Sequence, residues 1–174
     1  IEGERNGYTS HAGLAALREC VAKAHPAVAG RDAVLITAGA EEALFLAIMT
    51  LVDEGDEVLL PDPGFVAYPA LVRLAGGVPV FYRLPADRDF GFDPDVFRRR
   101  LSPRTRALVC ASPANPTGRV LTPEDLSLIA DAPRDTEVRV VADEVYRDPY
   151  FGATQPASIA DLYPRPVVAG RPST

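Results

Sequence analysis

The sequence predicts an α/β domain with three α/β/α layers and a mainly parallel sheet. Short apolar runs alternate with amphipathic stretches almost from end to end, which is typical of strands and helices that follow one another. The apolar runs do not alternate with polar residues, as expected for strands buried on both faces. With 174 residues and 47% apolar residues, the chain is large enough for one domain with a core of its own.

The first predicted elements are a helix, a strand and a second helix. Apolar residues recur at helical spacing over residues 12–24, which predicts a helix. Residues 33–37 form a short apolar run with β-branched members, which predicts a buried strand. Residues 41–52 carry their apolar side chains on one helical face, and Gly55 follows as a stop signal.

The same cycle then repeats. Residues 58–60 predict a strand, and a turn rich in proline and glycine follows at 61–64. The spacing of apolar residues predicts a helix over 68–75, which Gly76 and Gly77 end before a strand at 78–82.

The second half begins with an irregular connection over 84–94 and a short helix over 95–101. Thr122 has the character of an N-cap, because proline and two acidic residues follow it, and it predicts the start of another helix. The remaining strands are expected at 107–110, 138–142 and 166–170.

Composition excludes several classes of partner. The chain has 18 basic and 24 acidic residues, and its longest basic run, residues 98–100, is expected on a solvated helix face, so we expect no nucleic-acid partner. No apolar stretch reaches the ~18–20 residues that span a bilayer, so we expect no membrane partner. Cys20 and Cys110 lie outside metal-ligand spacing, and we expect both to be buried in a reducing, cytoplasmic compartment, with no metal site.

The residues that follow each strand are the candidate site, because ligands of open α/β sheets bind at the carboxyl ends of the strands. Gly39 opens a helix whose free N–H groups could hold a phosphate, although plain turn chemistry also explains a glycine there. Phe65 and Tyr68 lie at a loop-to-helix junction, either against a planar ligand or in the core. Asn115 lies in a proline-rich turn. Asp143 ends a buried strand and needs a cationic partner or a proton donor.

Four motifs, in this order, resemble the large domain of fold-type I pyridoxal-phosphate-dependent aminotransferases of class I/II, the aspartate/aromatic kind. The motifs are Tyr8-Thr-Ser-His-Ala-Gly13, Gly55-Asp-Glu-Val58, Asn115-Pro-Thr-Gly118 and Ala142-Asp-Glu-Val-Tyr146. The resemblance covers the whole chain. It implies pyridoxal 5'-phosphate as cofactor, and the fold of the PLP-transferase large domain, here incomplete.

The resemblance also implies roles for individual residues. Asp143 would keep the pyridine nitrogen protonated, and Asn115 and Tyr146 would donate to the ring hydroxyl oxygen. Phe65 would stack on the ring. Residues Gly39, Ala40 and Glu41 would line the phosphate, although relatives often have a hydroxyl or basic residue in that turn. Tyr8 would reach the phosphate of a neighbouring subunit, which implies a homodimer.

The family's Schiff-base lysine has no counterpart in this chain, whose single lysine is Lys23. Family spacing places that lysine at or just after Thr174, so no catalytic residue is assigned within the chain. We therefore expect residues 1–174 to be a large domain truncated at both ends, with the small domain absent, inactive by itself and binding the cofactor weakly without a covalent bond.

For the whole protein, the resemblance implies an enzyme that transfers an amino group between an amino acid and a 2-oxo acid. Two alternatives stay open, namely a ligand-sensing module of a transcription regulator and a pyridoxal-phosphate-dependent C–S lyase. The residues that set substrate choice lie largely outside this stretch, so the sequence does not identify the substrate.

Overall fold

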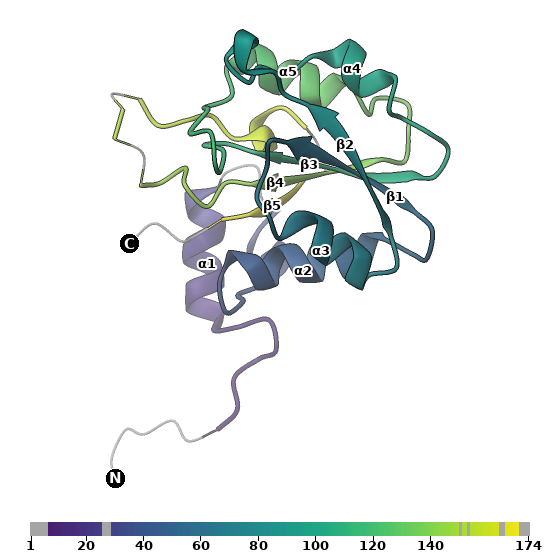
Figure 1. The fold of residues 1–174 in the computed structure, drawn as a ribbon. Helices are drawn as coiled ribbons and strands as arrows, with labels where there is room; N and C mark the ends of the chain where they lie inside the picture. Colours follow the sequence, from purple (N-terminus) through teal and green to yellow (C-terminus); the bar gives the residue numbers. More distant parts are fainter. Residues whose placement is uncertain (1–6, 26–28, 150, 153, 164–165, 171–174) are drawn as a thin grey trace.

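A computed structural model describes residues 7–25, 29–149, 151–152, 154–163 and 166–170. Its centre is a five-stranded sheet in the order β2-β1-β3-β4-β5, and all neighbouring strands run parallel (Figure 1). The predicted α/β class with a parallel sheet is confirmed. The strands are β1 (Glu57–Asp62), β2 (Val78–Arg83), β3 (Thr105–Ala111), β4 (Arg139–Asp143) and β5 (Val167–Ala169).

Helices cover both faces of the sheet, so the predicted three layers are present. Figure 1 shows α2 and α3 on one face and α4 and α5 on the other. The α-helices are α1 (Ala15–Ala24), α2 (Ala40–Leu51), α3 (Tyr68–Leu74), α4 (Pro94–Arg98) and α5 (Pro123–Asp131). Three short 3₁₀ helices are η1 (Arg31–Ala33), η2 (Ala86–Arg88) and η3 (Ile159–Asp161).

Each face of the sheet has its own apolar core, because successive strand residues point to opposite faces. Leu59 and Leu108 belong to the cluster under α4 and α5, whereas their neighbours Leu60 and Val109 belong to the cluster under α2 and α3. All four side chains are fully buried or nearly so. Burying one such side chain contributes about 1.5–3 kcal/mol, so the two clusters hold the layers together.

Helix α5 begins as the sequence predicts. The Thr122 hydroxyl accepts from the Asp125 amide at 3.1 Å, and the Asp125 carboxylate accepts from the Thr122 amide at 2.9 Å. This reciprocal pair satisfies two N–H groups that the helix itself cannot. Pro123 occupies the first helical position.

The predicted strand over residues 33–37 is wrong. Residues 34–37 pair with no strand in the part of the chain that the structure describes. Their backbone instead bonds to the preceding segment: the Ile36 amide donates to the Ala12 carbonyl at 3.0 Å, and the Arg18 guanidinium donates to the Val34 carbonyl at 2.8 Å. An apolar, β-branched run predicts an extended backbone, but a strand also needs a neighbour, which local sequence does not provide.

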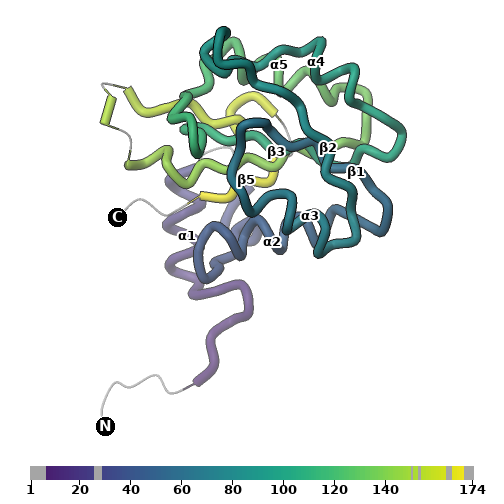
Figure 2. Tube along the Cα trace, viewed as in Figure 1, coloured from purple at the N-terminus to yellow at the C-terminus, as the bar shows by residue number. Residues whose placement is uncertain are grey.

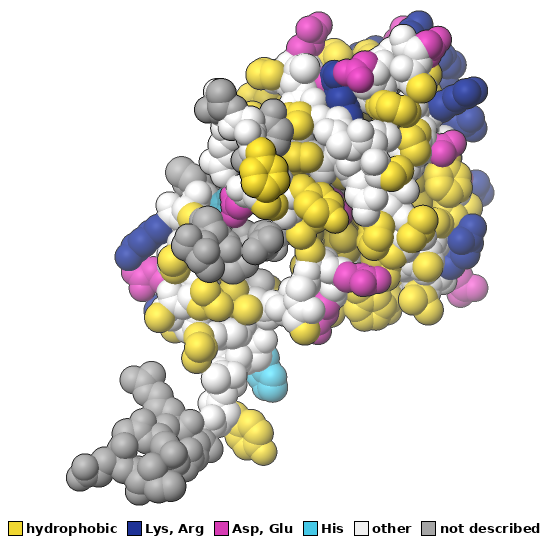
Figure 3. Space-filling view, turned by 60° about the vertical axis from the view of Figure 1, so that its left-hand side comes forward, with side chains coloured by type: hydrophobic (Ala, Val, Ile, Leu, Met, Phe, Trp, Pro, Cys, Tyr) yellow, Lys and Arg dark blue, Asp and Glu magenta, His cyan; other side chains and the backbone are white. Residues whose placement is uncertain are grey.

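The predicted burial of both cysteines is half right. Cys110 is buried in β3, and Cys20 is exposed on α1. No residue of α1 is buried, because within the described residues this helix packs mainly against η1. Residues 98–100 are exposed as expected, but α4 ends at Arg98, so only the first of them lies on a helix. In the view of Figure 3, Lys and Arg side chains lie mainly along the right-hand edge, with acidic and apolar side chains between them.

Candidate functional site at the carboxyl edge of the sheet

The carboxyl ends of the central strands lie level with one another. Ala111 at the end of β3 pairs with Asp143 at the end of β4, and Asp143 pairs with Ala169 of β5. Helix α2 precedes β1 and runs back toward the amino ends of the strands, so its N-terminus lies at the same carboxyl edge. The topology therefore gathers the strand-end residues that the sequence singled out.

Asp143 is the centre of this edge. Its side chain is buried, with 8% of the residue exposed. One carboxylate oxygen accepts from the Tyr68 hydroxyl at 2.7 Å, and the other accepts from the Val145 amide at 3.3 Å. Among the described residues no arginine or lysine forms an ion pair with Asp143. Two neutral donors orient the carboxylate and leave its charge uncompensated, so the site fits a cationic ring nitrogen.

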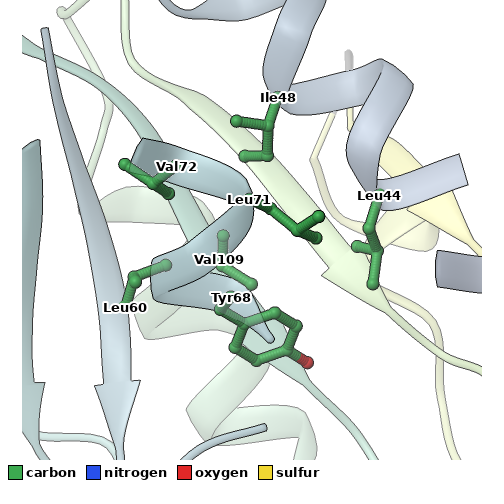
Figure 4. A pocket seen from close by; sticks show the side chains of 7 residues that line it. All are labelled: Leu44, Ile48, Leu60, Tyr68, Leu71, Val72 and Val109. Carbon is green, nitrogen blue, oxygen red and sulfur yellow. The ribbon is translucent and has the colours of Figure 1, made fainter. Parts of the chain in front are cut away.

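Tyr68, which the sequence left undecided between core and site, packs in the core and also contacts the Asp143 carboxylate. Figure 4 shows its ring among apolar side chains of α2, α3 and the sheet, with the hydroxyl directed away from them. Burial, and secondly the Asp143 carboxylate, raise the pKa of the phenol well above its ordinary value. The hydroxyl therefore stays protonated and acts as a permanent donor.

Phe65 lies beside this pair. Its ring meets the Tyr68 ring edge-on, with centroids 5.5 Å apart and an interplanar angle of 83°. Phe65 is half-buried, whereas Tyr68 is 3% exposed. The buried ring of Tyr68 thus supports the more accessible ring of Phe65, which is the one that the sequence assigned to stacking.

Asn115 lies half-buried in the turn after β3. The turn is closed by the Ala114 amide, which donates to the Arg119 carbonyl at 2.8 Å, and by the Gly118 amide, which donates to the Ala114 carbonyl at 2.7 Å. Gly118 has φ of 71°, a value that glycine adopts without strain. The turn is attached to β4 because the Ser112 amide donates to the Asp143 carbonyl at 3.1 Å.

The turn expected to line the phosphate lies at the start of α2. Gly39 is the N-cap residue of α2 with φ of 106°, and Ala40 is the first residue of the helix. The Thr37 hydroxyl donates to the Gly39 carbonyl at 2.7 Å, which fixes the turn. Glu41 is exposed in the first helical turn. Because its charge opposes an anion, a phosphate here would depend on backbone N–H groups and the helix dipole.

The two other tyrosines expected in the cofactor site, Tyr146 and Tyr8, lie in different places. Tyr146 follows β4 by three residues and is 47% exposed. Tyr8 is fully exposed in the stretch before α1, and Figure 2 shows this stretch running away from the sheet. Tyr146 therefore belongs to the edge, whereas Tyr8 does not join it within this chain.

Glu144 is a buried group that the sequence treated only as part of a motif. It is 6% exposed and accepts from the Ser158 hydroxyl at 2.8 Å and from the Ile159 amide at 3.1 Å. Burial raises the pKa of its carboxyl above the ordinary value, against the opposing effect of these hydrogen bonds. These hydrogen bonds hold η3 against the end of β4. Successive residues of a strand point to opposite faces of the sheet, so the position of Glu144 next to Asp143 could have indicated that the two side chains point in opposite directions.

Two further kinds of site are not found among the described residues. They contain no cluster of three or more His, Cys, Asp or Glu side chains that could hold a metal ion. None of the helices within them has the length and apolar character needed to cross a membrane.

A buried carboxylate at the end of a parallel strand, held by two neutral donors and without a cationic partner among the described residues, fits the protonated ring of a pyridine cofactor. Comparison with known proteins agrees. Residues 1–173 match the family of aminotransferases of class I and II. The chain belongs to this family, whose members depend on pyridoxal 5'-phosphate.

Individual relatives show the extent of the match. The chain is 38% identical over 161 residues to an aspartate aminotransferase of Geobacillus stearothermophilus, covering 90% of this chain and 41% of that protein. The structure of Thermus thermophilus aspartate aminotransferase with maleate matches with a TM-score of 0.85 and 32% identity, over 93% of this chain and 43% of that one. N-succinyldiaminopimelate aminotransferase from Mycobacterium tuberculosis matches with a TM-score of 0.82 and 37% identity, over 90% of this chain and 42% of that one. The chain thus spans about two fifths of the length of these relatives.

Proposed function

We propose that the whole protein transfers an amino group between an amino acid and a 2-oxo acid, and that this chain supplies the floor of its cofactor site. The observation that carries the proposal is Asp143, a buried carboxylate held by two neutral donors at the carboxyl edge of the sheet. Bound pyridoxal phosphate supplies the electron sink for this chemistry.

The residues of this chain have separate tasks in that site. Asp143 holds a proton on the ring nitrogen, and Tyr68 keeps the carboxylate in place. Phe65 stacks on the ring and excludes water from one of its faces. Asn115 and Tyr146 donate to the ring hydroxyl oxygen. The turn at Gly39, with Ala40 and Glu41, seats the phosphate through its backbone.

The lysine that attaches the cofactor and moves the substrate proton comes, in this proposal, from outside residues 1–174. Lys23 does not serve, because it lies on α1 with 75% of its side chain exposed and pairs with Glu19 at 3.1 Å. Likewise we propose that Tyr8 acts in a homodimer, on the phosphate of the neighbouring subunit.

A direct test uses the whole protein with and without pyridoxal phosphate. We expect visible absorbance from the bound cofactor and transamination of an amino acid with a 2-oxo acid. Elimination of thiol from a sulfur amino acid without transamination would favour a C–S lyase, and cofactor binding without either reaction would favour a sensing module. Residues 1–174 alone should bind the cofactor weakly, and reduction with borohydride should leave no cofactor attached to them.

A further inference from the structure

We propose that Arg119 is a positioning residue, which holds the turn of residues 114–119 so that the Asn115 amide meets the ring hydroxyl oxygen of the cofactor. This inference rests on the proposed function and adds to it a residue outside the motifs that the sequence singled out. Arg119 directly follows the Asn115-Pro-Thr-Gly118 motif.

The side chain of Arg119 joins three segments of the chain. One guanidinium nitrogen lies 3.0 Å from the Asp125 carboxylate in the first turn of α5, and another pairs with Asp89 in the loop after η2. The Arg119 side chain is 20% exposed and that of Asp125 is 11% exposed, so water screens this pair little. The planar guanidinium can bond two carboxylates at once, which an ammonium group does less well.

Asp125 is a rigid anchor for this contact. The same carboxylate oxygen that pairs with Arg119 also accepts from the Thr122 amide at 2.9 Å in the capping box of α5. The capping geometry therefore fixes the carboxylate independently of Arg119. Arg119 takes its position from the helix.

Two main-chain hydrogen bonds of Arg119 hold the residues on either side of Asn115. The Arg119 carbonyl accepts from the Ala114 amide at 2.8 Å, directly before Asn115. The Arg119 amide donates to the Thr117 hydroxyl at 3.2 Å, directly after the Asn115-Pro116 pair. Both flanks of Asn115 are thus tied to one residue whose side chain is held by α5. Movement of Arg119 would shift the Asn115 amide relative to Asp143, and small misplacements of this kind cost much of a site's activity.

The same helix offers a matched control. At the C-terminal end of α5, Arg134 pairs with Asp131, the last residue of the helix, with 71% and 54% of the two side chains exposed. This pair has the same chemistry as Arg119 and Asp125, but both side chains are exposed, and neither forms a hydrogen bond to the described residues of the turn. Arg134→Met removes an arginine–aspartate pair without reaching the site.

The experiment compares the whole wild-type protein with Arg119→Met, Arg119→Lys, Asn115→Ala and Arg134→Met. It measures the dissociation constant of pyridoxal phosphate, the pH midpoint of the visible absorbance change of the bound cofactor, and the melting temperature. A donor to the ring oxygen favours its anionic form, so its loss raises the midpoint. We expect Asn115→Ala and Arg119→Met to raise the midpoint and to weaken cofactor binding about tenfold, since each costs the cofactor the Asn115 hydrogen bond to its charged ring oxygen. Arg119→Lys should be intermediate, and Arg134→Met should match the wild type.

The outcomes separate the inference from the function on which it rests. A wild-type protein that binds no pyridoxal phosphate would refute the proposed function, and no shift in Asn115→Ala would refute the role of Asn115. If Asn115→Ala shifts the midpoint while Arg119→Met only lowers the melting temperature, the inference about Arg119 is overturned and the function stands. Should Arg119→Met not fold, a wild-type midpoint in Arg119→Lys would overturn it instead.

Discussion

Two buried carboxylates lie at opposite ends of the same sheet, and they are satisfied in opposite ways. Glu57, at the amino end of β1, is 7% exposed, and Asp143, at the carboxyl end of β4, is 8% exposed. Glu57 accepts from the Ser102 hydroxyl at 2.6 Å and from the Arg104 guanidinium at 3.0 Å, so its charge is compensated within the chain. Asp143 has only the neutral donors Tyr68 and Val145 among its described contacts.

The difference shows how one scaffold separates stability from chemistry. The hydrogen bonds of Ser102, followed by those of Arg104, lower the pKa of Glu57 and make its ionised form part of the folded state. A compensated carboxylate of this kind gives a ligand nothing further to neutralise. An uncompensated one costs stability and provides a place for a cation. Four substitutions test this comparison.

The largest effect is expected for Asp143→Asn in the whole protein. Loss of the charge that keeps the ring nitrogen protonated should reduce transamination by at least about a thousandfold. The matched change at the other end, Glu57→Gln, should leave kcat within about threefold, because Glu57 lies far from the site. Steady-state kinetics of the two variants tests this prediction. Near-normal activity of Asp143→Asn would contradict the role of Asp143 at the ring nitrogen.

The second-largest effect is expected for Tyr68→Phe. It removes a hydrogen bond to a buried carboxylate and should lower kcat about tenfold while destabilising the fold by about 1.5–3 kcal/mol. The control is Tyr82→Phe, since the buried Tyr82 hydroxyl donates to the Val109 carbonyl at 2.7 Å and does not contact Asp143. Urea unfolding should show a smaller loss of stability for Tyr82→Phe, about 0.5–1.5 kcal/mol, because its hydrogen bond joins two neutral groups. Kinetics should show a loss of activity only for Tyr68→Phe.

Glu57→Gln tests the stabilising end of the comparison and its pH dependence. Because the pKa of Glu57 is lowered from 4.5 in the folded state, the folded protein binds fewer protons there than the unfolded chain. Its stabilisation is therefore present above that ordinary pKa and is lost as the pH falls. At pH 7 we expect Glu57→Gln to cost about 2 kcal/mol of unfolding free energy. Urea unfolding of both proteins between pH 7 and pH 3 should show this gap closing, and a constant gap would refute the explanation.

The smallest effect is expected for Arg106→Gln. Arg106 pairs with Asp56 at 3.4 Å beside Glu57, but 43% of its side chain is exposed. Ion pairs of this kind contribute little, so the change in unfolding free energy should stay below about 0.5 kcal/mol. A loss as large as that of Glu57→Gln would show that the amino end depends on a charge network and not on Glu57 alone.

Local sequence was sufficient where local interactions decide the structure. The capping box of Thr122 and the apolar runs of β1, β3 and β4 predict their elements, because hydrogen bonds within four residues and burial on both faces produce them. The segment 34–37 and the exposed Cys20 were mispredicted for the converse reason. Their environment depends on which segments lie next to them, and residue type does not determine that.

By itself, the sequence determined the α/β class, the strand ends that carry polar residues, and the need of Asp143 for a partner. Only the tertiary structure decided which groups meet. Tyr68 and Asp143 are 75 residues apart in the chain and 2.7 Å apart at the edge of the sheet. Parallel strands bring their carboxyl ends to one edge through crossovers of many residues, so the pairing of side chains there follows from strand order and register, which no local pattern encodes.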